Sequence, residues 1–128
     1  MQAAGIYSHI KASVENVPTH RGGMTPYDLA RQFPWVTLDL RWAAMYAELA
    51  KFEALRTQLA NVHLSVQVNG SRFTLNPAWF PSVNQATDFY DVLDMIRGHW
   101  QYTGPLTVEI SGQASDRWED IQAALATL

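Results

Sequence analysis

Apolar residues in the middle of the chain recur at helical spacing. Between Thr37 or Asp39 and about Asn61 the apolar stripe steps by three and four residues in turn, which is close to coiled-coil spacing. This pattern predicts one long helix, the longest of the chain. The stripe consists of Trp42, Met45, Leu49, Phe52, Leu55 and Leu59.

A strict alternation of apolar and polar residues follows this segment. Two alternating runs, 63–68 and 71–76, flank the dipeptide Asn69-Gly70. An Asn-Gly pair between alternating runs is typical of a two-residue β-hairpin with a primed turn. The pattern therefore predicts a β-hairpin directly after the long helix.

Five further segments complete the predicted order of elements. They are a short helix over 3–15, a helix begun by Thr25-Pro26 and ended by Pro34, a helix over 83–100 capped by Ser82 and Gln85, a strand over Leu106–Ile110, and a last helix capped by Asp116 and Glu119. The order predicts an α+β fold, mainly helical, with a long central helix, a β-hairpin and a short additional strand. We expect residues 1–24 to form a partly helical N-terminal arm and residues 25–128 to form a single domain.

Composition narrows the functional classes. The 128 residues are 48% hydrophobic and include no cysteine, which excludes a disulfide scaffold, a thiolate nucleophile and a cysteine-ligated zinc site. The chain lacks both a secretory signal pattern and an apolar run of about 18 residues. We therefore expect no membrane contact and a cytoplasmic location, which is the host cytoplasm if the protein is viral.

Charge is unevenly distributed along the chain. The net charge is −3, and residues 61–128 hold most of the acidic excess. Asp88, Asp91 and Asp94 recur every three residues, which fits a magnesium site, an acidic patch for a basic partner, or a solvated helix face. The chain has no block of basic residues, which weighs against broad phosphate-backbone binding by a monomer.

No short motif indicates catalysis. The four histidines are neither three nor four residues apart, so no two of them form a helical metal-binding pair. Phosphate-binding and nucleophile-elbow glycine motifs are absent too. We expect no catalytic residue, no metal and no cofactor, and hence no enzyme. An enzyme site assembled from scattered residues would draw on His63, His99, Asp94 and Tyr102.

Residues 38–100 resemble the small terminase subunits of tailed phages that have a helix–hairpin–helix core. The resemblance lies in the segment Leu40 to Arg56, rich in Ala, Glu and Leu, in the hairpin Val66-Gln-Val-Asn-Gly-Ser-Arg-Phe, and in the step Asn76-Pro77-Ala78 before a second helix. It implies a ring-forming, non-enzymatic DNA-packaging protein. Such a homo-oligomer would bind viral DNA and present it to the large terminase subunit.

Two sets of residues would serve this role. The residues predicted for the oligomer or partner interface are Trp42, Met45, Leu49, Phe52 and Trp79, and those predicted for nucleic-acid contact are Arg31, Arg41, Arg56 and Arg72. The alternative is a small acidic inhibitor or adaptor that binds a host protein. In that hypothesis Asp88, Asp91 and Asp94 contact the basic partner.

Overall fold

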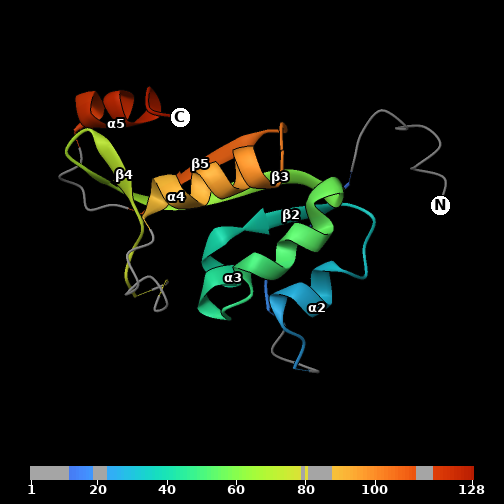
Figure 1. The fold of residues 1–128 in the computed structure, drawn as a ribbon. Helices are drawn as coiled ribbons and strands as arrows, with labels where there is room; N and C mark the ends of the chain where they lie inside the picture. Colours follow the sequence, from blue (N-terminus) through green and yellow to red (C-terminus); the bar gives the residue numbers. More distant parts are fainter. Residues whose placement is uncertain (1–11, 19–22, 79, 81–87, 112–116) are drawn as a thin grey trace.

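A computed structural model describes residues 12–18, 23–78, 80, 88–111 and 117–128. Its centre is a five-stranded, mostly parallel β-sheet (Figure 1). The strands are β1 (Val14–Glu15), β2 (Val36–Asp39), β3 (Leu59–Asn69), β4 (Arg72–Thr74) and β5 (Leu106–Ile110). β2 lies between β1 and β3, and β3 also pairs with β5, all in parallel, whereas β4 is antiparallel to the end of β3.

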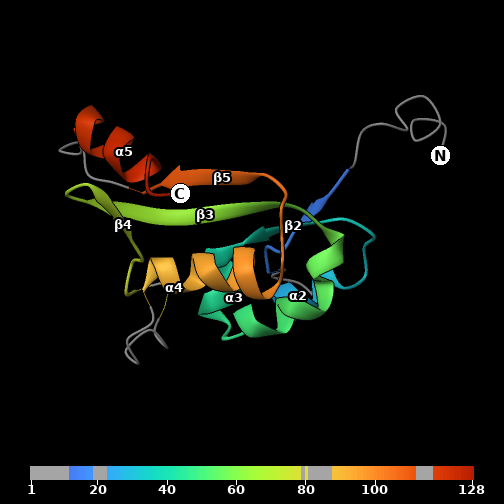
Figure 2. The same cartoon turned by 45° about the horizontal axis from the view of Figure 1, so that its top comes forward.

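Short helices connect and cover these strands. They are α2 (Pro26–Ala30), α3 (Leu40–Met45), the 3-10 helix η1 (Leu49–Gln58), α4 (Phe89–Asp94), the π-helix η3 (Met95–His99) and α5 (Trp118–Leu125). Figure 2 shows α2, α3 and α4 together on one side of the strands and α5 on the other. α5 packs on β4 and the adjoining part of β3. The fold is therefore α/β, and the prediction of a mainly helical α+β fold is wrong.

The hydrophobic core lies between the sheet and the helices α2, α3, η1, α4 and η3, which we call the helical layer. Successive strand residues point to opposite faces, and the apolar members of β2 and β3 alternate with polar ones. In each of these strands every second residue is the most deeply buried. Leu38, Val62, Leu64 and Val66 belong to this set, and none of them is exposed. This face of the sheet is therefore the apolar face.

The predicted long central helix is not formed. α3 ends at Met45, and Ala47 adopts a positive φ of 53°, which an α-helix cannot include. η1 then runs as a 3-10 helix, and the chain enters β3 at Leu59. Leu49, Phe52 and Leu55 are spaced by three, which suits the three residues per turn of a 3-10 helix. The apolar stripe thus belongs to three successive elements.

Several local predictions are confirmed. Thr25 caps α2, since its hydroxyl oxygen accepts a 3.2 Å hydrogen bond from the backbone N–H of Asp28. The predicted hairpin joins β3 to β4, but Asn69 still pairs with Arg72, so its two loop residues are Gly70 and Ser71 and not Asn69 and Gly70. Gly70 has a φ of +61°, as the first loop residue of a primed turn requires. β5 occupies Leu106–Ile110, as predicted.

Other local predictions are partly or wholly outside the described residues. Of the helix predicted over 3–15, the described part forms the strand β1, so the prediction is wrong there. The cap predicted at Ser82 and Gln85 lies outside the described residues, and α4 begins instead after Asp88. The predicted last helix is present as α5, although Asp116 lies outside the described residues.

Among the described residues, every helix is too short or too polar to cross a lipid bilayer.

Candidate functional site

The face of the sheet opposite the core carries the polar residues of the same strands. We call it the polar face. The strand register aligns its members in neighbouring rows, from β1 across β2 and β3 to β5. Its members are Glu15, Thr37, Asp39, Asn61, His63, Ser65, Thr107 and Glu109.

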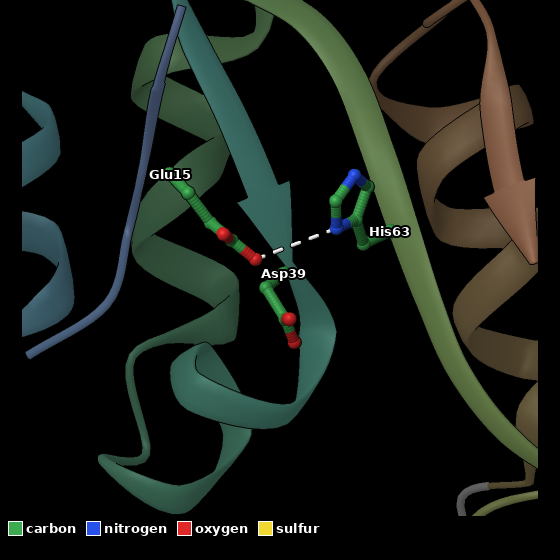
Figure 3. A group of neighbouring side chains, drawn as sticks. All are labelled: Glu15, Asp39 and His63. Carbon is green, nitrogen blue, oxygen red and sulfur yellow. Dashed lines mark ion pairs between the residues drawn. The ribbon is translucent and has the colours of Figure 1, made fainter. Parts of the chain in front are cut away.

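Three side chains with metal-binding atoms converge on the polar face (Figure 3). Glu15 ends β1, Asp39 ends β2, and His63 lies opposite Asp39 on β3. One possible ligand atom from each residue lies within 4.8 Å of the other two. Glu15 Oε1 and His63 Nδ1 are 3.4 Å apart. We call these three residues the Glu–Asp–His cluster.

Hydrogen bonds fix the carboxylate of Asp39. Its Oδ1 accepts 2.8 Å and 3.2 Å bonds from the backbone N–H of Arg41 and the hydroxyl of Ser65. The first bond caps α3, so the start of that helix holds the carboxylate in place. Asp39 is only 5% exposed. Its orientation is therefore set before any ligand arrives.

The backbone of Asp39 is fixed as well. The buried Asn16 follows β1, and its side-chain Oδ1 accepts a 2.6 Å bond from the N–H of Asp39. The Nδ2 of the same amide donates a 3.2 Å bond to the carbonyl of Asp39. The side-chain amide of Asn16 thus makes the two hydrogen bonds that a backbone residue of a neighbouring strand would otherwise make to Asp39. It ties β1, and hence Glu15, to the end of β2.

The proximity of the two carboxyl groups has an electrostatic cost. Partial burial, followed by hydrogen bonding to and repulsion from Asp39, raises the pKa of Glu15 above its usual value of 4.5. His63 lowers this pKa, whereas the negative charge of Glu109 raises it further. Folding therefore concentrates negative charge here, and a cation that bound between the carboxylates would relieve the repulsion.

The cluster is accessible from solvent at two of its three members. The side chains of Glu15 and His63 are 39% and 26% exposed. The carboxyl ends of parallel strands are a common place for ligand binding in α/β sheets. The arrangement therefore offers two oxygen ligands and one nitrogen ligand to an ion that approaches from outside.

The residues predicted for an oligomer interface have different environments. Phe52 is fully buried in the core, and Leu49 is partly buried against it. Trp42 is half-buried, and Met45 is exposed at the end of α3. Trp79 lies outside the described residues. The described members therefore do not form one exposed stripe.

The four arginines predicted for nucleic-acid contact lie on separate elements. Arg31 directly follows α2, Arg41 and Arg56 lie on α3 and η1, and Arg72 lies on β4. Each contacts a residue close by, through an ion pair, a hydrogen bond or an aromatic ring. The contacts join Arg31 to Asp28, Arg41 to Trp42, Arg56 to Glu53, and Arg72 to Tyr90.

The predicted acidic patch forms a helix cap. Asp88 and Asp91 make a reciprocal capping box at the start of α4, in which each carboxylate accepts a bond from the backbone N–H of the other residue. Asp94 ends α4. Helix capping therefore explains Asp88 and Asp91, and no partner protein is needed to account for them.

The histidines considered for an enzyme site are not together. His63 belongs to the Glu–Asp–His cluster, whereas His99 contacts Glu53 on the helical layer, at 3.2 Å between Nε2 and Oε1. The expectation that the chain binds no metal rested on sequence spacing. It missed a cluster whose members meet only through parallel strand pairing.

A comparison of the chain with protein-family models, curated proteins and solved structures gives no match.

Proposed function

We propose that this protein binds one divalent transition-metal ion through Glu15, Asp39 and His63. The observation that carries the proposal is the convergence of three ligand atoms within 4.8 Å of one another. Two of the three come from carboxyl groups, and partial burial, followed by the closeness of Asp39, raises the pKa of Glu15. A bound cation would compensate this repulsion and stabilise the folded state.

The donor atoms and their spacing fit such an ion. In a tetrahedral site with bonds of about 2.0–2.2 Å, two ligand atoms lie about 3.4 Å apart. Glu15 Oε1 and His63 Nδ1 already have this spacing, at 3.4 Å. All three ligand atoms lie within 4.8 Å of one another, so shifts of about 1 Å in the partly exposed Glu15 and His63 side chains bring them onto one ion. The bonds that Arg41 and Ser65 donate to Asp39 supply the outer-shell orientation that metal ligands usually have.

The mixture of donors indicates which ions to expect. Calcium and magnesium prefer sites made of oxygen alone, whereas imidazole suits zinc, iron and similar ions. One imidazole with two carboxylates therefore favours Zn²⁺ or Mn²⁺ over Ca²⁺ and Mg²⁺.

A simpler arrangement could use the same three residues. A protonated His63 between the two carboxylates would form an ion-pair network with no metal. The two arrangements differ in one measurable property, because only the metal site gains stability when the ion is added.

Calorimetric titration of the chelator-treated full chain with Zn²⁺ and Mn²⁺ tests the proposal. We expect one ion per chain and a rise in the melting temperature on binding. Replacement of a ligand, His63→Ala, should weaken binding at least about 100-fold, which is the upper end of the loss for an outer-shell partner.

The matched control is His99→Ala. His99 also contacts a single glutamate, but it lies outside the cluster. This variant should bind the ion as the unaltered chain does. Identical isotherms for the unaltered chain and His63→Ala would reject the metal site and favour the ion-pair network.

The DNA-packaging role and the alternative of an acidic inhibitor stay predictions. The fold lacks the long helix on which the terminase resemblance partly rested. The native mass in solution and a DNA-binding assay would test the packaging role, which requires a closed ring of many subunits. A monomer that binds no DNA would exclude it.

A further inference from the structure

The charge of the metal-loaded cluster restricts its partners, provided that the proposed function holds. The two carboxylates contribute two negative charges, and a neutral imidazole contributes none. A divalent ion therefore brings the complex to zero net charge. A site of this kind does not attract anions electrostatically, unlike an ion held by histidines alone.

The surroundings on the polar face reinforce this restriction. Glu109 lies one strand beyond Ser65, at the position paired with it. Its negative charge is near enough to act on Glu15. Among the described residues, the charges that act on Glu15 are those of Asp39, His63 and Glu109. An approaching anion would meet repulsion here.

The protein leaves part of the coordination sphere to other ligands. Three protein atoms bind the ion, and Zn²⁺ in catalytic-type sites with three protein ligands keeps a fourth position for water or another ligand. The exposed sides of Glu15 and His63 face solvent. The remaining positions are therefore open to exchange.

Neutral hydrogen-bonding groups flank the cluster. Thr107 is paired with His63 across β3 and β5, at the spacing of about 4.8 Å between neighbouring strands. Its hydroxyl bonds to the side-chain amide of Asn61, with distances of 2.9 Å and 3.2 Å. Hydroxyl and amide groups both donate and accept hydrogen bonds, so they suit a ligand that does the same.

We infer that the metal-loaded polar face binds a neutral polyhydroxyl ligand, a sugar or a polyol. Adjacent hydroxyl oxygens of the ligand occupy the open positions on the ion. Asn61 and Thr107 bond to further hydroxyls of the same molecule.

Water-proton relaxation of the Mn²⁺-loaded full chain tests this inference. Bound Mn²⁺ with exchangeable water enhances the relaxation rate, and a ligand that displaces the water lowers it. The probes are D-mannitol as an open-chain polyol, methyl D-mannoside as a ring sugar, acetate and inorganic phosphate. We expect a polyhydroxyl probe to act at about tenfold lower concentration than either anion, the ratio that about one additional good hydrogen bond supplies.

A variant tests the contribution of the flanking groups. Thr107→Val should remove that tenfold advantage, whereas Thr103→Val, a matched change in the loop before β5, should keep it. The Mn²⁺ affinity of each variant is measured separately, so that loss of the ion is not mistaken for loss of the sugar.

Each outcome decides one step. A chain that binds neither Zn²⁺ nor Mn²⁺ removes the proposed function together with the inference. If the chain binds Zn²⁺ alone, calorimetry of the Zn²⁺-loaded chain with the same four probes replaces the relaxation measurement. Mn²⁺ binding without relaxation enhancement, or with stronger displacement by acetate or phosphate, overturns the inference and leaves the metal site standing. An unchanged polyhydroxyl advantage in Thr107→Val overturns it too. Mannitol and the mannoside, compared with each other, distinguish an open-chain ligand from a ring.

Discussion

The two faces of the sheet come from alternate residues of the same strands, but they differ in almost every physical respect. On β3, Leu64 points into the core and is fully buried, whereas its neighbours His63 and Ser65 lie on the polar face. The apolar face is covered by short helices (Figure 2). The polar face gathers carboxylates that repel each other.

This difference separates stability from binding. Burial of apolar surface stabilises the fold, and the apolar face supplies most of that burial. The Glu–Asp–His cluster opposes folding through the raised pKa of Glu15. Local features that reduce stability are expected at functional sites. Substitutions on the two faces should therefore affect different measurements.

The largest expected effect comes from the apolar face. Leu64→Ala would leave a cavity where no side-chain surface is exposed, and such a change costs about 3 kcal/mol of the free energy of unfolding. Urea unfolding measures this loss, while the ion affinity of the folded fraction should not change. His63→Ala, one residue earlier, should lower the ion affinity and leave the free energy of unfolding almost unchanged. Similar losses of stability in both variants would show that the faces are not separate.

The second effect concerns Asn16, the residue that ties β1 to the end of β2. Asn16→Ala removes the side chain that bonds to both the N–H and the carbonyl of Asp39. Buried groups left without a hydrogen bond cost about 2 kcal/mol of the free energy of unfolding. We also expect weaker ion binding, because β1 carries Glu15. Asn76→Ala is the control, since Asn76 makes one exposed bond to Ala78. Equal unfolding curves for the two variants would contradict the role given to Asn16.

Sequence patterns predicted the elements that depend on local chemistry. The hairpin follows from Asn69-Gly70, and the start of α2 follows from Thr25 and Pro26, because a turn or a cap needs only neighbouring residues. β1 and β2 are only two and four residues long, so any alternation in them is short. Their pairing partners are distant in sequence, so their parallel arrangement was not predicted.

The candidate site was missed for the same reason. Its residues lie on three strands, and local spacing between histidines gave no sign of it. A signal was present in the alternation Val36-Thr-Leu-Asp and Val62-His-Leu-Ser, in which polar residues share one parity. The helical spacing of the residues that follow placed the end of the first segment, Val36-Thr-Leu-Asp, in the predicted long helix. The three-residue steps of this spacing in fact suit the 3-10 helix η1.

A smaller effect is expected from Ser65, which positions Asp39. Ser65→Ala removes the hydroxyl that donates to Asp39 Oδ1, and loss of an outer-shell partner lowers metal affinity about tenfold or more. The stability cost should stay near 1 kcal/mol. Ser111→Ala, which removes a hydroxyl bonded to the carbonyl of Val66, should leave the affinity unchanged. Calorimetry of both variants checks the difference.

The smallest effect comes from Glu15, and its sign depends on pH. The pKa of Glu15 is raised in the folded state, so folding favours the protonated form. Its stabilising contribution is complete below the unfolded value of 4.5 and is lost as the pH rises through the folded pKa. Glu15→Gln is neutral at every pH. Without divalent ions, it should therefore melt about 2 °C above the unaltered chain at pH 7.5.

This advantage of Glu15→Gln should disappear at pH 4, where both chains carry a neutral side chain at position 15. Glu53→Gln is the control, because Glu53 contacts His99 on the helical layer and not the cluster. Saturating Mn²⁺ should reverse the order at pH 7.5, since the ion stabilises only the chain that keeps the carboxylate. A Glu15→Gln variant that is less stable than the unaltered chain at pH 7.5 without ions would mean that Glu15 stabilises the sheet. The polar face would then resemble the apolar face in its contribution to folding, and the case for a cation would lose its electrostatic basis.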